Sequence, residues 1–96
     1  MMAQDLHSVT IITILMKPVT IAPDDSINYD DFVSGNSVQL RVKVDEKEAS
    51  QYKKGLTVEV VHENEKLQGK IVSEPLVVSP SIEHGEKTLS LIIEKV

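Results

Sequence analysis

The 96-residue chain contains no cysteine. It therefore has no disulfide scaffold, no thiol nucleophile and no cysteine-based zinc or iron–sulfur site. No other residue pattern indicates a cofactor, so we expect none. The lack of cysteine fits a reducing compartment, and the expected location is the cytoplasm.

Aromatic residues are nearly as scarce, at 3% of the chain, and comprise Tyr29, Phe32 and Tyr52. A core built without them must consist of Val, Ile and Leu, which pack well on pleated surfaces. Positive charge is also in the minority, because ten Lys and Arg face fifteen Asp and Glu and leave a net charge of −5. Without a basic footprint or a series of stacking platforms, nucleic acid is not an expected partner.

Long hydrophobic runs are absent as well. The apolar stretch over residues 9–16 is far too short to span a bilayer. The residues before it include Asp5 and no Lys or Arg, so the stretch lacks the positive leader of a signal peptide. Its β-branched content predicts a core strand, and we expect no membrane association.

What is present is a series of strand patterns. In residues 37–44, Val38, Leu40, Val42 and Val44 alternate with polar residues, which predicts a strand with one buried and one exposed face. Similar segments follow, and the expected strands cover residues 9–16, 37–44, 56–60, 67–73, 76–78 and 88–96. The sequence thus predicts a single mainly β domain over residues 1–96, a β-barrel or two-layer roll of about six short strands.

One short helix is predicted between two strands, at residues 45–54. Asp45 is placed to cap its first free N–H groups, and Glu48 to reach back as in a capping box. Gly55 is placed as a left-handed C-cap, and Ala49 and Tyr52 share one face. We expect two to three helical turns packed against the sheet.

Residues 23–36 allow two interpretations. Asp24 and Asp25 are able to cap a short helix that runs to Val33 and stops at Gly35, and an irregular acidic loop fits equally well. Oxygen donors recur through this stretch as in a calcium loop. However, Tyr29 replaces the glycine of the turn and Gly35 the closing glutamate, so the EF-hand pattern fails. A solvated loop is expected, and the weak metal candidates are Asp24, Asn28 and Asp30.

Catalytic motifs are missing. The three histidines, His7, His62 and His84, do not pair at a metal-ligand spacing, and surface or turn positions are expected for them. The chain has no G-x-S-x-G, no phosphate loop and no G-x-G-x-x-G. We therefore predict no catalytic residues, and an enzymatic function is not expected.

A family resemblance comes from residues 38–93. Val-x-Leu-x-Val-x-Val-Asp-Glu-x-x-Ala-x-x-Tyr-Lys-Lys-Gly-Leu-x-Val-x-Val is followed by Leu-Gln-Gly-Lys-Ile-Val-Ser. This pattern resembles the β-barrel domain of periplasmic adaptor (membrane-fusion) proteins. The resemblance implies an assembly spacer without catalytic residues. Because the chain shows no export signal, anchor cysteine, coiled-coil hairpin or lipoyl-like half, an excised barrel or a free-standing cytosolic relative is expected.

Two functional hypotheses follow. The first is a non-enzymatic β-barrel module that acts through protein–protein contacts. The alternative is a small PUA-like ligand-binding or hydrolytic domain that uses the acidic loop at residues 24–31 and a histidine at a barrel mouth. A pocket that gathers His62, His84 and carboxylates would favour the alternative.

Overall fold

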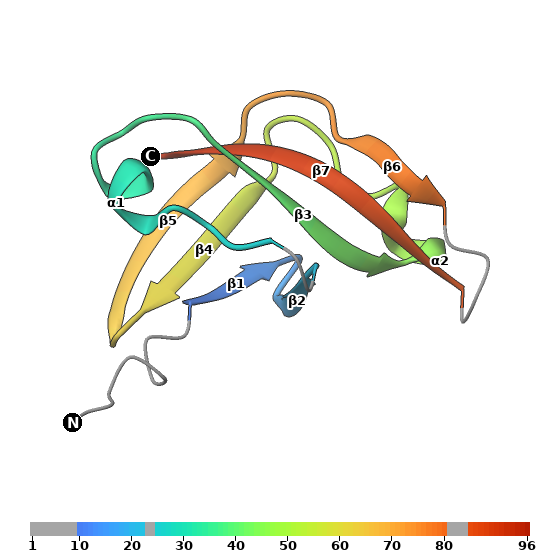
Figure 1. Ribbon diagram of the computed structural model, residues 1–96, viewed down its shortest axis with the longest axis horizontal. Helices are drawn as coiled ribbons and strands as arrows, with labels where there is room; N and C mark the ends of the chain where they lie inside the picture. Colours follow the sequence, from blue (N-terminus) through green and yellow to red (C-terminus); the bar gives the residue numbers. More distant parts are fainter. Residues whose placement is uncertain (1–9, 23–24, 81–84) are drawn as a thin grey trace.

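A computed structural model describes residues 10–22, 25–80 and 85–96, and Figure 1 shows its elements. The described chain contains seven strands and two short helices. In order they are β1 (Thr10–Ile14), β2 (Lys17–Ile21), α1 (Tyr29–Val33), β3 (Val38–Asp45), α2 (Glu46–Ala49), β4 (Thr57–His62), β5 (Glu65–Ile71), β6 (Leu76–Pro80) and β7 (Glu86–Lys95).

Six of the strands close an antiparallel barrel, which confirms the predicted fold class. The sheet runs β3-β2-β1-β4-β5-β7, and β7 pairs again with β3 over the whole of β3, from Val38↔Ile93 to Asp45↔Glu86. β6 lies outside this ring, paired to the first half of β7. Closure satisfies the backbone groups of edges that would otherwise be open.

The core fills the barrel with aliphatic side chains at every second position. On β3 the four predicted residues are buried while Gln39 and Arg41 are exposed and Lys43 is half-buried, so the predicted register is confirmed. β7 presents three further core residues in the same way. The barrel-lining aliphatic residues with 5% exposure or less are Ile12, Ile14, Val38, Leu40, Val42, Val44, Val58, Val60, Ile71, Leu89, Leu91 and Ile93.

Helix α1 supports a plug at one end of the barrel, the end opposite α2 in Figure 1. Its N-cap is Asn28, whose side-chain oxygen accepts from Asp31 N at 3.1 Å. It ends in a Schellman arrangement, because Gly35 N donates to Phe32 O and Asn36 N to Asp31 O. Of the two interpretations for this stretch, the helix end at Val33 with Gly35 is confirmed, whereas the helix starts three residues later than an Asp25 cap requires.

The plug is Phe32, which is fully buried. Its ring lies against Gly69 of β5, where an added Cβ would be 2.9 Å from the Phe32 ring and 2.5 Å from Glu94 O. The β4–β5 register continues unbroken through Gly69, so no bulge is present there. Glycine is required at this point because the ring and a neighbouring backbone approach too closely for any side chain.

Helix α2 is much shorter than predicted. The cap at Asp45 is confirmed, since its carboxylate accepts from Lys47 N at 2.8 Å, but the helix ends at Ala49. The chain tightens into i→i+3 bonds that bury Tyr52, and Gly55 N then bonds to Ile71 O at 2.7 Å. This link to β5 pulls the chain out of helical geometry. Gly55 has the expected positive φ of 95°, but in a turn rather than as a helix cap.

Strand β2 was not predicted. Pro18 interrupts its pattern, and the turn before it, Leu15-Met16, contains no usual turn residue. Both residues adopt left-handed φ values, 58° and 63°, as a two-residue primed hairpin turn demands. Leu15 packs against the core, whereas Met16 is 94% exposed. The strain at Met16 is therefore not offset by packing within the described chain.

Met16→Gly is expected to stabilise the fold by about 0.5–1 kcal/mol, because glycine adopts positive φ without the Cβ clash. Met16→Ala, which keeps the clash, serves as the matched control and should bring no such gain. Denaturant midpoints of the two variants measure the difference. A Met16→Gly midpoint at or below that of Met16→Ala would show that the turn is not strained.

Candidate functional sites

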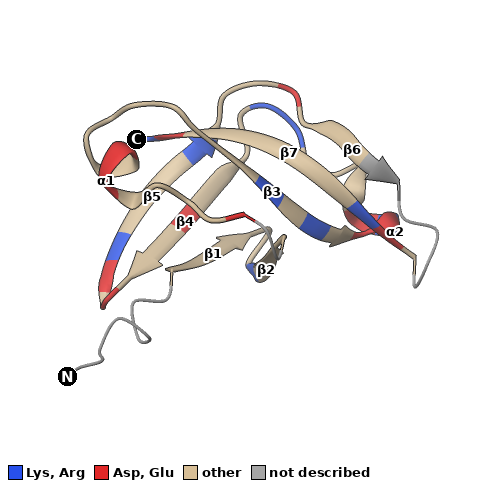
Figure 2. Cartoon of the chain, in the orientation of Figure 1, with Lys and Arg blue, Asp and Glu red and all other residues tan. Residues whose placement is uncertain are grey.

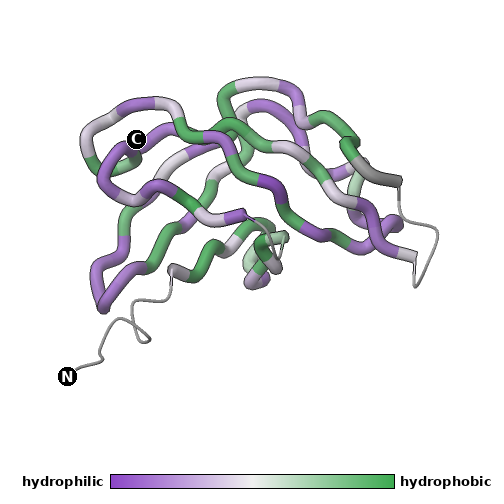
Figure 3. Tube along the Cα trace, in the orientation of Figure 1, coloured by the Kyte–Doolittle hydropathy of each residue, from purple (hydrophilic) through white to green (hydrophobic). Residues whose placement is uncertain are grey.

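The first candidate site is the exposed strand β6. Its residues Leu76, Val77 and Val78 are 65%, 50% and 47% exposed. Because successive residues of a strand point to opposite faces, this strand is apolar and uncovered on both faces. Figure 3 colours its described part as hydrophobic, and in Figure 2 that part carries neither the colour of Lys and Arg nor that of Asp and Glu. Exposed aliphatic residues in succession are the usual mark of an interaction surface.

The backbone of β6 is exposed too. β5 leaves the ladder of β7 after Ile71, and β6 takes its place beside β7 after Pro75. Among the described strands, β6 is the only one that pairs on one side alone. The register slips between Val77 and Ser79, which marks a bulge at Val78. The bulge and the two flanking prolines shorten the free edge to a few residues, which limits uncontrolled aggregation.

The second candidate is the barrel mouth beside α1, where a pocket of about 310 Å³ is lined by His62 and by four residues of the acidic loop. Its lining is Thr10, Ile21, Asp25, Ser26, Ile27, Tyr29 and His62. The Tyr29 ring stacks on the His62 ring at 4.1 Å between centroids. Thr10 Oγ1 lies 2.7 Å from His62 Nδ1, and Glu63 Oε2 lies 3.5 Å from His62 Nε2. Both ring nitrogens therefore already have partners.

Tyr29 is also engaged on its other side. Its hydroxyl donates to Glu65 Oε1 at 3.2 Å. Desolvation, followed by the negative charges of Glu65 and Glu63, raises the pKa of this hydroxyl above its ordinary value. The phenol therefore stays protonated and keeps donating at neutral pH. The arrangement holds α1 to the β4–β5 hairpin.

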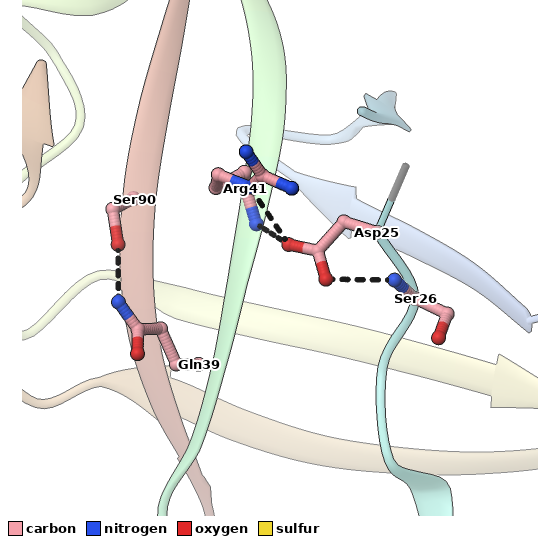
Figure 4. A network of polar contacts seen from close by, with 5 residues as sticks. All are labelled: Asp25, Ser26, Gln39, Arg41 and Ser90. Carbon is pink, nitrogen blue, oxygen red and sulfur yellow. Dashed lines mark hydrogen bonds and ion pairs between the residues drawn. The ribbon is translucent and has the colours of Figure 1, made fainter. Parts of the chain in front are cut away.

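Asp25 links the loop before α1 to Arg41 of β3, as Figure 4 shows. One carboxylate oxygen accepts from Arg41 N at 2.7 Å and from Arg41 Nε at 3.4 Å, and the other accepts from Ser26 N at 2.9 Å. Although burial opposes ionisation, these hydrogen bonds and the guanidinium together lower the pKa of Asp25. On the neighbouring strand pair, Gln39 Nε2 donates to the buried Ser90 hydroxyl.

The other predicted residues do not join this pocket in the described structure. His7, His84 and Asp24 lie outside the described residues. The side-chain amide oxygen of Asn28 caps α1, and Asp30 lies exposed on the first turn of this helix. Among residues 10–22, 25–80 and 85–96 no group of three or more His, Asp or Glu side chains is placed to hold a metal ion.

The mouth thus brings together His62 and Asp25, as the ligand-binding alternative requires. The side chains of Asp25, Tyr29 and His62, however, already have hydrogen-bond or ion-pair partners, as they would in a purely structural closure of the barrel. The exposed strand was missed as a site because residues 76–78 were assigned to the barrel. The available signal was three aliphatic residues without polar alternation between two prolines.

Comparison with known proteins adds no family: no family model, no curated protein and no solved structure matches the chain. Within the described part of the chain, neither helix has the length and apolar character needed to cross a bilayer.

Proposed function

We propose that this small β-barrel is a non-enzymatic protein-binding module that receives an extended segment of a partner protein along β6. The observation that carries the proposal is the run Leu76–Val78, exposed on both faces and next to an unpaired backbone edge. An extended segment placed there forms main-chain hydrogen bonds and covers aliphatic side chains at the same time. Without such a segment, one edge of β6 stays unpaired in the described structure and its aliphatic side chains stay exposed.

The partner segment is expected to be aliphatic and free of charge where it pairs. The described side chains of β6 carry no charge, so a Lys or Glu opposite them would lose solvation without a partner. Successive Val, Ile or Leu residues would instead cover Leu76 on one face and Val77 on the other, next to the bulge at Val78. This pattern defines the chemistry of the segment that the site selects.

A second copy of the chain is a poorer occupant. A stable interface needs about 20–30 residues on each side, and an antiparallel pair of β6 strands supplies only five from each copy. Each copy also brings a net charge of −5. A different protein does not necessarily carry this repulsive charge, and strand addition by a peptide gains its affinity from main-chain hydrogen bonds.

Two of our expectations agree with this role. The resemblance to adaptor-protein barrels implies an assembly contact without catalytic residues, and we retain that kinship as a proposal. A cytoplasmic location likewise remains proposed.

The experiment is a selection of displayed random peptides on the intact chain, with counter-selection on Val77→Lys. The selected peptides should contain an uncharged run of successive aliphatic residues and should bind Val77→Lys at least about tenfold more weakly, since a buried unpaired ammonium is costly. Val33→Lys, also at an exposed valine but on α1, is the matched control and should bind as the unchanged chain does.

Three results would contradict the proposal. They are peptides without an aliphatic run, equal binding to Val77→Lys, and a stable dimer in sedimentation that Val77→Lys dissolves. The last would show that a second copy occupies β6.

A further inference from the structure

A third surface feature lies on the outside of the barrel at the tip of the β1–β2 hairpin, away from both β6 and the mouth. It is a pocket of about 560 Å³, the larger of the two described here. Its lining is Thr13, Leu15, Met16, Leu56, Thr57, Glu59 and Gln68. A volume of this size lies within the range of small-molecule sites.

The floor of the pocket is a polar row across three strands. Thr13 of β1 is opposite Glu59 of β4, and Glu59 is opposite Gln68 of β5. In the described chain, the side chains of Thr13 and Gln68 make no hydrogen bond, and the Glu59 carboxylate forms one ion pair, with Lys66 Nζ at 4.0 Å. The Glu59 side chain is 32% exposed, whereas that of Lys66 is 64% exposed. The Glu59 side chain is thus less exposed than that of the cation it pairs with.

The wall of the pocket is apolar and includes the strained turn. Leu15 and Leu56 are half-buried, and Met16 extends into solvent at a φ of 63°. The flexible thioether of methionine adapts to differently shaped aliphatic groups. Met16 is thus an apolar residue at positive φ that lines a pocket and packs against nothing in the described part of the chain. A contact with a bound ligand would explain why the chain keeps it there.

We propose that this pocket binds an aliphatic ammonium group, with its charge on Glu59 and its hydrocarbon along Leu15, Met16 and Leu56. An ammonium has three N–H donors, and the polar row offers a carboxylate flanked by a hydroxyl oxygen and an amide oxygen. A ligand ammonium would form a charge-assisted hydrogen bond that Lys66 Nζ, at 4.0 Å from the Glu59 carboxylate, does not make. The inference is independent of strand addition at β6.

The same chemistry has two sources, a free aliphatic amine and a lysine side chain of a peptide. NMR titration of the intact chain with n-butylamine, Nα-acetyl-lysine methylamide, butyrate and butanol distinguishes them. Both ammonium probes should shift the amides of Thr13, Glu59 and Gln68 saturably, whereas butyrate and butanol should bind at least about tenfold more weakly. Tighter binding of butylamine assigns a free amine, and tighter binding of the lysine derivative assigns a peptide.

Variants locate the site. Glu59→Gln should weaken butylamine at least about tenfold, and Met16→Gly should weaken it several-fold while keeping the fold intact. Glu74→Gln removes the same charge from an exposed position outside the pocket and should change nothing. Equal binding of butyrate or butanol to the unchanged chain would overturn the proposal without any variant. Unchanged butylamine binding by Glu59→Gln would overturn it as well.

Discussion

Phe32→Ala should lower the free energy of unfolding by about 3–5 kcal/mol, the usual cost of removing a buried phenylalanine. Phe32 is the largest fully buried side chain of the described structure, and its ring closes one barrel end over Gly69. The stability of a domain is only about 5–15 kcal/mol in total, so the loss is a large part of it. Denaturant titration measures the effect.

The matched control is Val33→Ala, the next residue of α1, which is 39% exposed and should cost less than about 1 kcal/mol. Gly69→Ala should also destabilise, because its Cβ would lie 2.5 Å from Glu94 O unless the strand or the plug shifts. Similar losses for Phe32→Ala and Val33→Ala would show that α1 does not plug the barrel.

Leu40→Ala should lower the free energy of unfolding by about 2–5 kcal/mol, because Leu40 has no exposed surface and lies in the middle of β3. Its neighbour Arg41 points outward. Arg41→Ala keeps the backbone N–H that Asp25 accepts and loses only the 3.4 Å contact of Nε, so it should cost less than about 1 kcal/mol. The comparison is sharp because both residues share a strand.

The two variants are compared by their denaturant midpoints at equal slope. If Arg41→Ala is as damaging as Leu40→Ala, β3 does not have one buried face, and the barrel built on its pairing with β7 is wrong.

The parts of the fold that alternation encodes were predictable. β3 and β7 repeat apolar residues at period two, and every such residue lies in the core. Features set by distant contacts were not. Nothing local in the sequence of α2 shows that the bond from Gly55 to Ile71 shortens the helix, or that the ring of Phe32 is the reason for glycine at position 69.

For the candidate sites, too, individual residues could be predicted from the sequence, but their arrangement in space could not. His62 and Asp25 were singled out separately, but their shared pocket depends on how β4 and the loop before α1 meet. The strand at residues 76–78 was recognised as β, yet its exposure depends on the order of strands around the barrel. That order places β6 beside β7 and outside the closed ring. Strand order is a global property that a local pattern does not contain.

Amide hydrogen exchange of the chain, alone and with a selected peptide, tests strand addition at β6 most directly. Backbone pairing at an open edge should slow the exchange of amides within Leu76–Val78 on peptide binding, while those of β3, already paired within the barrel, stay unchanged. Protection of residues 76–78 that Val77→Lys abolishes is the result we predict. Protection confined to the mouth around His62, with β6 exchanging as in the free chain, would contradict it.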